Sequence, residues 1–375
     1  MKLHIIAAAL PPQLDGIGDY TACLAAELAH SAEVTIFTGS PQPTPIPGVC
    51  IKTAFSADNP ASVREIAAFV EADLPDWILL QYNPFAYGRW GLNLALPETL
   101  RRLRRSLPRT RLAVMVHEPF VPIITPQFAV MASWQRWQLW RLGQTADVLF
   151  FSIAPWAEHF RKWFPGKPVY HLPVGSNIRR VPITRPEARA RLGIPPGAIV
   201  LGLFGTASSG RLLDRAKAAL DALRSDGIPV QFLYVGPDTA AICAALGSEN
   251  IIAGGPFPAD EVSRRLSAID IYLAAYIDGV STRRGAFMAT LQHGCAIVAT
   301  RGPLTDDMLK QEAGRSFLLT DVADLNAFTE AVVGLAKDTD QRQQLSRQAQ
   351  ELYGREFAWK KIATRLVAAL ETTSK

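Results

Sequence analysis

The chain has 375 residues, of which 49% are hydrophobic and 19% are charged, with a formal net charge of +5. This composition excludes a disordered chain, and at about 150 residues per domain the length predicts two domains. The modest positive charge does not require nucleic acid as a partner, but it permits an anionic ligand or an anionic membrane surface.

No run of about 18 uninterrupted apolar residues occurs, so the sequence predicts no membrane-spanning helix. The apolar residues 1–10 are followed by Pro11, Pro12 and Asp15 without a small-residue cleavage site. We interpret them as a buried first strand and not as a signal peptide. The cysteines share no metal-binding or redox spacing, which favours reduced thiols in a cytoplasmic protein. They are Cys23, Cys50, Cys243 and Cys295.

Apolar runs rich in β-branched residues alternate with amphipathic stretches through the first half of the chain. This alternation predicts a parallel sheet covered by helices on both faces. The expected strands are Leu3–Ala8, Val34–Thr38, Trp77–Tyr82, Leu112–His117, Val148–Ser152 and Val169–Leu172. The expected helices include Gly18–His30, Ser62–Ala72 and Phe128–Leu142.

Residues 179–195 interrupt this rhythm with prolines and charges and are predicted to form a linker. The rhythm then restarts, which predicts a second doubly wound domain over residues 196–355. Its expected strands are Ile199–Phe204, Val230–Val235, Ile251–Ala253, Ile269–Ala274 and Ala296–Ala299, with helices such as Arg211–Arg224 and Ala259–Ala268. Residues 1–178 form the first domain, and the final helix, 356–375, is expected to pack back on it.

Open parallel sheets bind ligands at the carboxyl ends of their strands, so the loops after strands are the candidate sites. The first loop contains Gly16, Ile17 and Gly18 and leads into a helix whose free N–H groups suit an anion. A dinucleotide fingerprint fails here, because Thr21 occupies the third glycine position and no acid follows the second strand near Thr38.

Two further loops of the first domain are polar. His117 stands at the end of the fourth strand and before Pro119, where its imidazole is placed to bind a hydroxyl or a developing charge. A purely structural histidine is the alternative. Asn83 follows the third strand in a similar polar loop.

The second domain opens with Gly205 and Thr206, followed by a predicted helix that has Arg211 in its first turn. Small and hydroxyl residues before a helix start, together with an arginine, suit a phosphate. The alternative is an ordinary capped helix with Arg211 facing solvent.

The most specific segment runs from Ile277 to Met288. We predict a helix beginning near Ser281, with Ser281 or Thr282 as its N-cap. Arg283 and Arg284 then occupy the first turn, where the helix dipole disfavours cations. A bound diphosphate would reverse that penalty, and a solvated arginine pair is the alternative.

Together these segments resemble the GT-B glycosyltransferases, and within them the family 4 retaining enzymes, often called glycosyl transferase group 1. The resemblance spans nearly the whole chain, and it depends on the order and spacing of the pieces. The matching pieces are Asp15–Tyr20, the His117 loop, Leu172–Asn177, Leu203–Arg211, Gly254–Phe257 with Asp260 and Glu261, Asp278–Arg284, Gly294–Val298 and Phe357–Trp359.

The resemblance implies two Rossmann-like domains facing a central cleft, with the nucleotide sugar held by the C-terminal domain and the acceptor by the N-terminal domain. It also assigns roles to single residues. It places Gly16, Ile17 and Gly18 beside the donor phosphates, His117 near the transferred sugar, Arg211 on a phosphate, Phe257 at the nucleobase, and Ser281 and Thr282 at the diphosphate.

One departure concerns the two glutamates that the family usually carries eight positions apart around this last loop. Asp278 stands in place of the first, or, in an ungapped register, Ser281 and Ala289 occupy the two positions. No glutamate occurs from Ile277 to Gln311. We expect the segment 281–284 to supply substitute contacts.

The resulting hypothesis is a retaining transfer of a hexose from a nucleoside diphosphate sugar, with UDP-glucose or a similar donor favoured. The acceptor is a hydroxyl of a saccharide or glycolipid in polysaccharide biosynthesis. His117, Arg211 and Arg283 are the expected catalytic residues, with Arg284 on the diphosphate. Sugar or acceptor contacts are expected from Asp19, Asn83, His117 and Asp278.

No metal or further cofactor is expected, because the one Asp-x-Asp, at Asp338 and Asp340, lies between late helices. Two alternatives remain open. One is a non-catalytic nucleotide-sugar sensor or scaffold, supported by the missing glutamates. The other is a sugar-nucleotide epimerase with the same fold.

Two surface features complete the predictions. Six arginines between Arg101 and Arg111 either contact anionic lipid or form a solvated helix face, so a peripheral position at the inner membrane face stays open. Trp134, Trp137 and Trp140 recur at helical spacing, for which core packing is the expected role. An acceptor platform or a lipid-facing wedge is the alternative.

Overall fold

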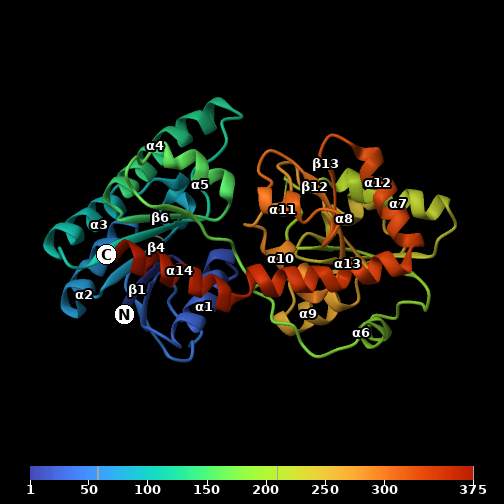
Figure 1. The fold of residues 1–375 in the computed structure, drawn as a ribbon, viewed down its shortest axis with the longest axis horizontal. Coiled ribbons are helices and arrows are strands. Elements are labelled where there is room, and N and C mark those ends of the chain that lie inside the picture. The colour runs from blue at the N-terminus through green and yellow to red at the C-terminus, as the bar shows by residue number, and fades with distance from the viewer. Residues whose placement is uncertain (57–58, 209, 375) are drawn as a thin grey trace. The chain divides into compact units, whose positions relative to one another are not determined.

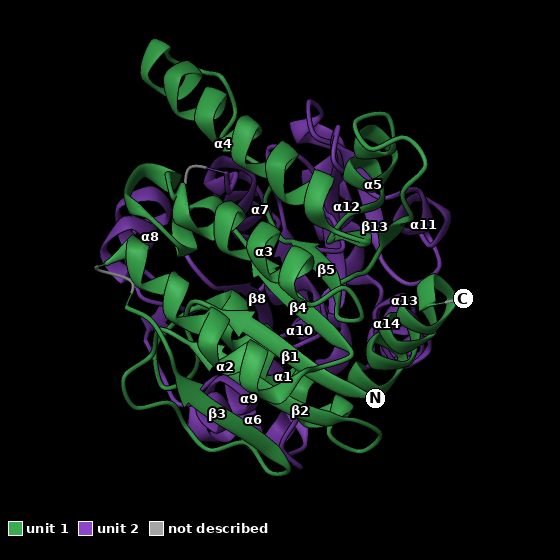
Figure 2. Ribbon diagram, turned by 90° about the vertical axis from the view of Figure 1, so that its left-hand side faces the viewer, with its two compact units in different colours: residues 1–173, 359–375 green, residues 174–358 purple. Residues whose placement is uncertain are grey.

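The structure is a computed structural model that describes residues 1–56, 59–208 and 210–374 (Figure 1). Its contacts divide the chain into two compact units (Figure 2). Unit 1 combines residues 1–173 with residues 359–375, and unit 2 consists of residues 174–358.

Within its described residues, unit 1 contains a seven-stranded parallel sheet in the order β3-β2-β1-β4-β5-β6-β7. The strands are β1 (Lys2–Ala7), β2 (Glu33–Thr38), β3 (Val49–Thr53), β4 (Trp77–Tyr82), β5 (Arg111–Val116), β6 (Val148–Phe151) and β7 (Val169–His171). The helices are α1 (Gly16–Leu28), α2 (Ile66–Asp73), α3 (Ala95–Ser106), α4 (Pro126–Thr145), α5 (Ala154–Arg161) and α14 (Trp359–Ser374).

Unit 2 contains a six-stranded parallel sheet in the order β10-β9-β8-β11-β12-β13, counted over its described residues. The strands are β8 (Ile199–Phe204), β9 (Val230–Val235), β10 (Ile251–Gly254), β11 (Ile271–Ala274), β12 (Ala296–Arg301) and β13 (Leu318–Asp321). The helices are α6 (Arg185–Arg191), α7 (Leu213–Ser225), α8 (Thr239–Leu246), α9 (Ala259–Ser267), α10 (Gly285–His293), α11 (Asp307–Gln311), α12 (Leu325–Lys337) and α13 (Thr339–Leu352).

Central strands form because they are apolar on both faces. Every residue of β4 is buried, as is every residue of β11. Helices packed on the two faces of each sheet complete the cores, as the parallel topology requires. The predicted fold class, two doubly wound Rossmann-like domains, is therefore confirmed.

Three elements differ from the sequence-based expectation. The edge strands β3 and β13 were not predicted, and the expected linker 179–195 contains the helix α6. Thr184 and Glu187 begin this helix with reciprocal hydrogen bonds between side chain and backbone, a capping box. Pro186 lies in the first turn of α6, where proline is tolerated, so it was misinterpreted as part of a linker.

The last helix, α14, belongs to unit 1 and packs on α1. Ile362, Leu366 and Leu370 are its large buried side chains. The Arg111 guanidinium donates to the backbone carbonyls of Thr373 and Ser374 and so closes the C-terminal end of the helix. In the described ranges, no helix combines the length and the apolar character needed to cross a bilayer.

Candidate functional site

The strand order of unit 2 reverses between β8 and β11, so the loops after these two strands lie side by side. Backbone hydrogen bonds join them: Ile277 N–H donates to Gly210 O, and Leu212 N–H donates to Ala275 O, at 2.9 and 3.1 Å. An isolated antiparallel bridge between Arg211 and Tyr276 completes the junction. The strand-end position predicted for the phosphate loops is thus where ligands bind in open α/β sheets.

Arg211 lies before its helix and not in the first turn, because α7 begins at Leu213. The guanidinium folds back toward β8, where Nη2 donates to Phe204 O at 2.7 Å and Nε donates to Thr206 O at 3.2 Å. Its Nη1 is buried and has no hydrogen-bond partner in the part of the chain that the structure describes. One donor of an always charged side chain therefore remains for a ligand.

Tyr276 connects the two arginine loops, although no role was predicted for it from the sequence. Its ring centroid lies 4.9 Å from Cζ of Arg211 and 4.4 Å from Cζ of Arg284. Cation–π contact with both guanidinium groups gathers the charges that the sequence had placed on separate loops. The only signal for it was an aromatic residue at the end of a buried strand.

Asp278 lies between the paired arginines. Its Oδ2 accepts from Arg283 Nη2 at 2.5 Å and its Oδ1 accepts from Arg284 Nη2 at 2.6 Å. All three side chains are partly exposed, at 17%, 16% and 22% respectively. The arginines are thus held by a carboxylate, which the sequence analysis did not anticipate. Counting Arg211, the cluster still has a surplus of positive charge.

The helix after this loop begins later than predicted. Residue Arg284 is the N-cap of α10, its side chain makes no cap hydrogen bond, and the first helical residue is Gly285. The predicted N-cap at Ser281 or Thr282 is therefore wrong. Both side chains are fully buried, and Thr282 N–H donates instead to the carboxylate of Asp306 at 2.7 Å.

Glycines let the strand ends of unit 2 approach one another closely. Gly205 has φ +95° and its carbonyl accepts from the Tyr234 hydroxyl at 2.9 Å. A Cβ on Gly236 would lie 2.4 Å from that carbonyl oxygen, so no side chain fits there. Thr206 is exposed beside this bare backbone.

Phe257 lies after β10, in the third strand-end loop on this side of the sheet. Its ring is half-buried and has the Arg265 guanidinium 4.0 Å from its centroid. Arg265 is in turn fixed by Glu261, whose Oε1 accepts from Nε at 2.7 Å. The ring is therefore held in place within unit 2.

In unit 1 the strand order reverses between β1 and β4, and α1 starts beside this point. The N-cap of α1 is Asp15, whose Oδ1 accepts from Gly18 N–H at 2.6 Å. A Cβ on Gly18 would lie 2.9 Å from the carbonyl oxygen of Ala9, whereas one on the exposed Gly16 would meet nothing within 4 Å. Ile17 and Asp19 are half-buried in the same turn.

His117 is buried at the end of β5. Its Nε2 lies 2.8 Å from Gln81 Oε1, and the Tyr20 ring packs edge-on against the imidazole at 4.7 Å between centroids. Burial lowers the pKa of His117 to about 3, so the imidazole is neutral near pH 7. Tyr20 also packs against Trp359 of α14, a neighbour that strand-end reasoning does not find. Asn83 caps a short 3₁₀ turn, accepting from Phe85 N–H at 2.9 Å.

The arginines between 101 and 111 are mostly engaged within unit 1. Arg101 and Arg102 bind Glu98, Arg104 binds Asp147, and Arg111 caps α14. In contrast, the tryptophans expected in the core are not there. Trp137 and Trp140 are 44% and 42% exposed, so the core-packing expectation is wrong for both.

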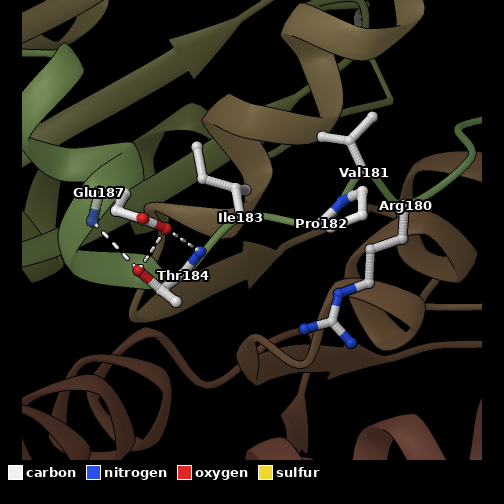
Figure 3. A pocket seen from close by; sticks show the side chains of 6 residues that line it. All are labelled: Arg180, Val181, Pro182, Ile183, Thr184 and Glu187. Atoms are coloured by element: carbon white, nitrogen blue, oxygen red, sulfur yellow. Dashed lines mark hydrogen bonds between the residues drawn. The ribbon is translucent and has the colours of Figure 1, made fainter.

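Two other features carry no site. A cavity of about 570 Å³ is lined by Arg180, Val181, Pro182, Ile183, Thr184 and Glu187 (Figure 3). It contains none of the strand-end residues, and Thr184 and Glu187 bind each other there. Among the described residues no group of three or more His, Cys, Asp or Glu is placed to hold a metal ion. Asp338 caps α13 by accepting from Gln341 N–H at 2.8 Å, as a helix-end acid does.

No family model and no curated protein sequence matches this chain. Solved structures do match. Sucrose-phosphate synthase from Thermosynechococcus elongatus is 17% identical, with 99% of this chain and 98% of that chain covered and a TM-score of 0.74. Anabaena HepE, solved in complex with UDP-glucose, is 14% identical over 99% and 100% of the two chains, with a TM-score of 0.71.

WaaG, a glycosyltransferase involved in lipopolysaccharide biosynthesis, is 13% identical over 98% of each chain, with a TM-score of 0.66. These proteins have the GT-B fold of two Rossmann-like domains. The likeness shows that the present chain has this fold, which confirms the family of folds that the sequence segments resemble.

Proposed function

We propose that this chain is a glycosyltransferase that moves a hexose from a nucleoside diphosphate sugar to a hydroxyl group. The observation that carries the proposal is the arginine cluster at the switch point of unit 2. A buried guanidinium nitrogen of Arg211, without a partner among the described residues, and two partly exposed arginines at the start of α10 suit a diphosphate.

The donor diphosphate is assigned to Arg211, Arg283 and Arg284 together with the first amides of α10. These amides have no side-chain cap, so they are available to an anion. Ser281 and Thr282 are fully buried, so we assign them to the support of this turn. The bare backbone at Gly205 and Thr206 is the surface for the nucleoside, with Phe257 near the base.

Transfer breaks the bond between the anomeric carbon and the diphosphate oxygen and forms a bond to the acceptor oxygen. The bonding electrons stay on the diphosphate, where the arginines stabilise the developing charge. The acceptor proton passes to a phosphate oxygen of the leaving group. We favour attack from the face that the leaving group vacates, which retains the anomeric configuration and needs no carboxylate nucleophile.

Acceptor recognition is assigned to the strand-end loops of unit 1. The neutral imidazole of His117 suits a hydrogen bond with a sugar hydroxyl, because it can donate or accept without carrying charge. Asp19, in the first turn of α1, and Asn83, directly after β4, lie at the same edge of the sheet. Asp278 is proposed as a donor-sugar contact, since each of its oxygens can accept a second hydrogen bond.

A UDP-hexose such as UDP-glucose is the favoured donor, and the UDP-glucose complex of HepE supports this choice. A saccharide or glycolipid is the favoured acceptor, in polysaccharide assembly on the cytoplasmic side. The role of WaaG in lipopolysaccharide biosynthesis supports this choice. Residues 281–284 would replace the contacts that the two glutamates make in the family 4 enzymes.

The alternative is a nucleotide-sugar sensor without turnover, which the absence of glutamate from Ile277 to Gln311 favours. A panel of UDP-, GDP- and ADP-sugars with mixed saccharide acceptors separates the two. Release of free nucleoside diphosphate that depends on an acceptor is the expected result. Saturable binding with no release under any acceptor would establish the sensor, and no binding of any donor would reject both.

A further inference from the structure

Helix α4 buries two glutamines among the apolar residues of its inner face and exposes three large apolar side chains on its outer face. Its inner face carries Gln135 and Gln138, neither of which has any exposed surface. Its outer face carries Val130, Trp137 and Trp140, which are 58%, 44% and 42% exposed. Large exposed apolar groups on one helix face mark an interaction surface, because the hydrophobic effect disfavours their contact with water.

The buried glutamines explain why this orientation is stable. Gln135 Oε1 accepts from Val121 N–H at 2.9 Å, and its Nε2 donates to Trp90 O at 3.2 Å. Gln138 Oε1 accepts from Asn93 N–H at 2.8 Å. The inner face therefore binds the backbone at Trp90, Asn93 and Val121, and turning the helix over would leave these groups unsatisfied.

The exposed apolar residues of this part of unit 1 come from α4 and from the segments before α3 and α4. Along α4, Val130, Trp134, Trp137 and Trp140 follow at helical spacing. Trp134 donates from its indole nitrogen to Trp90 O at 3.1 Å, which joins the neighbouring loop to the stripe. We call the α4 surface the set of exposed side chains Trp90, Leu94, Ile123, Ile124, Val130, Trp137 and Trp140.

Basic residues lie on and beside this surface: Arg136 and Arg141 on α4, and Arg89 next to Trp90. Residues 84–97 and 119–146 contain neither Asp nor Glu, and the acids that adjoin these segments are Glu98, Glu118 and Asp147. Of these, Glu98 and Asp147 are paired with arginines of the 101–104 segment. The N-terminal end of α4, next to the exposed Ile123 and Ile124, projects from unit 1 (Figures 1 and 2). Tryptophan with arginine is the combination that binds the boundary between headgroups and acyl chains.

We propose that the α4 surface docks on a bilayer that contains anionic lipid, with the tryptophans inserted at the headgroup level and the arginines bound to lipid phosphates. The helix lies on the membrane and does not cross it, since its inner face, with Gln135 and Gln138, is bound to other segments of unit 1. The arginines between 101 and 111, which mostly pair within unit 1, are not the docking surface.

The test is co-sedimentation of the full chain with vesicles of phosphatidylcholine alone or mixed with phosphatidylglycerol, without nucleotide sugar. The wild-type chain should bind the mixed vesicles and not the pure ones. Trp137→Ser with Trp140→Ser should lower the partition coefficient about tenfold or more. Leu74→Ser, which changes an even more exposed apolar residue elsewhere on unit 1, is the control and should leave binding unchanged.

Two double variants that remove the same amount of charge distinguish the arginines of the α4 surface from those of α3. Arg89→Gln with Arg141→Gln should weaken binding about fivefold for each arginine, whereas Arg102→Gln with Arg105→Gln on α3 should change it less than twofold. Trp137→Phe with Trp140→Phe should keep most of the binding.

Four results would overturn the proposal. They are absence of binding to any vesicle, equal binding to both vesicle types, loss of binding only with the α3 pair, and a dimer in solution that the tryptophan variant dissociates. The last result would identify a second copy as the occupant. Because binding is measured without a donor, none of these outcomes depends on the proposed transfer reaction.

Discussion

Helices α1 and α10 each start beside the point where the strand order of their own unit reverses, α1 after β1 and α10 after β11, yet these two helix starts differ in charge. At α1 the carboxylate of Asp15 binds the amide of Gly18, so an acid within the chain already occupies the place of an anion. At α10 the cap is Arg284, and the first amides have no side-chain partner.

We therefore propose that the donor diphosphate binds at the start of α10, whose first amides have no side-chain cap, in preference to the start of α1. Sequence alone made them look alike, since both have small residues before a helix and both were expected to lie near donor phosphates. The two turns differ in what their nearby carboxylate binds. At α1 the carboxylate of Asp15 accepts from a helix amide, whereas near α10 the carboxylate of Asp278 accepts from the two arginines.

Removal of Arg283 should have the largest effect on this difference. Arg283→Ala is expected to lower kcat/KM for donor turnover about a hundredfold, because it deletes a charge aimed at the leaving diphosphate. Arg301→Ala, which removes an exposed arginine paired with Asp321, is the control. Steady-state kinetics and circular dichroism check it, and unchanged turnover in a folded Arg283 variant would remove its assigned role.

A second prediction concerns the close packing at the start of α1. Gly18→Ala should destabilise the protein by about 2 kcal/mol, because its Cβ would lie 2.9 Å from the Ala9 carbonyl oxygen. Gly16→Ala places the same group in open space and should cost less than about 1 kcal/mol. Urea unfolding of both variants measures the difference, and equal midpoints would show that the turn relaxes without cost.

The third prediction uses the histidine that packs on α1. The unfolded chain binds a proton on His117 near pH 6.5, whereas burial lowers the folded-state pKa to about 3. Stability should therefore fall as pH drops below about 6.5, by up to about 1.4 kcal/mol per pH unit from this group. His117→Gln should make that dependence shallower between pH 6 and pH 4.

The control for this experiment is Thr21→Val, a buried change on α1 that removes no titrating group. It should lower stability at every pH and leave the slope as in the wild-type chain. If His117→Gln also keeps the wild-type slope, the imidazole does not stay neutral in the folded protein.

The smallest expected effect is a change in UDP affinity when an aspartate is replaced by asparagine, either near α10 or at the start of α1. Asp278→Asn removes the charge that balances the two arginines and should tighten UDP binding several-fold, with turnover lowered because the guanidinium groups lose their support. Asp15→Asn keeps a capping side chain and should change UDP affinity less than twofold. Isothermal titration calorimetry with UDP compares them, and equal changes would show that the two turns are alike.

Much of the fold followed from the sequence, because central strands that are buried on both faces leave an apolar run. β3 and β13 escaped detection since they are short edge strands, in which half-buried and exposed positions replace a continuous apolar run. Helix starts were misplaced where distant residues decide them. Thr282 binds Asp306, and Arg211 pairs with Tyr276, and neither contact has a local signal.

The site was predicted in outline and not in its connections. Strand-end reasoning found Arg211, Arg283 and Arg284, but it could not know that one tyrosine ring and one carboxylate hold them. Spacing placed Trp137 and Trp140 on one face of α4. Which face is buried depended on the partners of Gln135 and Gln138, which come from elsewhere in the chain.

The discontinuous make-up of unit 1 has a consequence for biosynthesis. A ribosome releases residues 174–358 before residues 359–375, so unit 2 has its full sequence while unit 1 still lacks α14. Until that helix emerges, Tyr20 has no Trp359 to pack against, and Arg111 has no carbonyls of residues 373 and 374 to bind. The part of the chain made first is therefore the part completed last, the reverse of the usual order for successive domains.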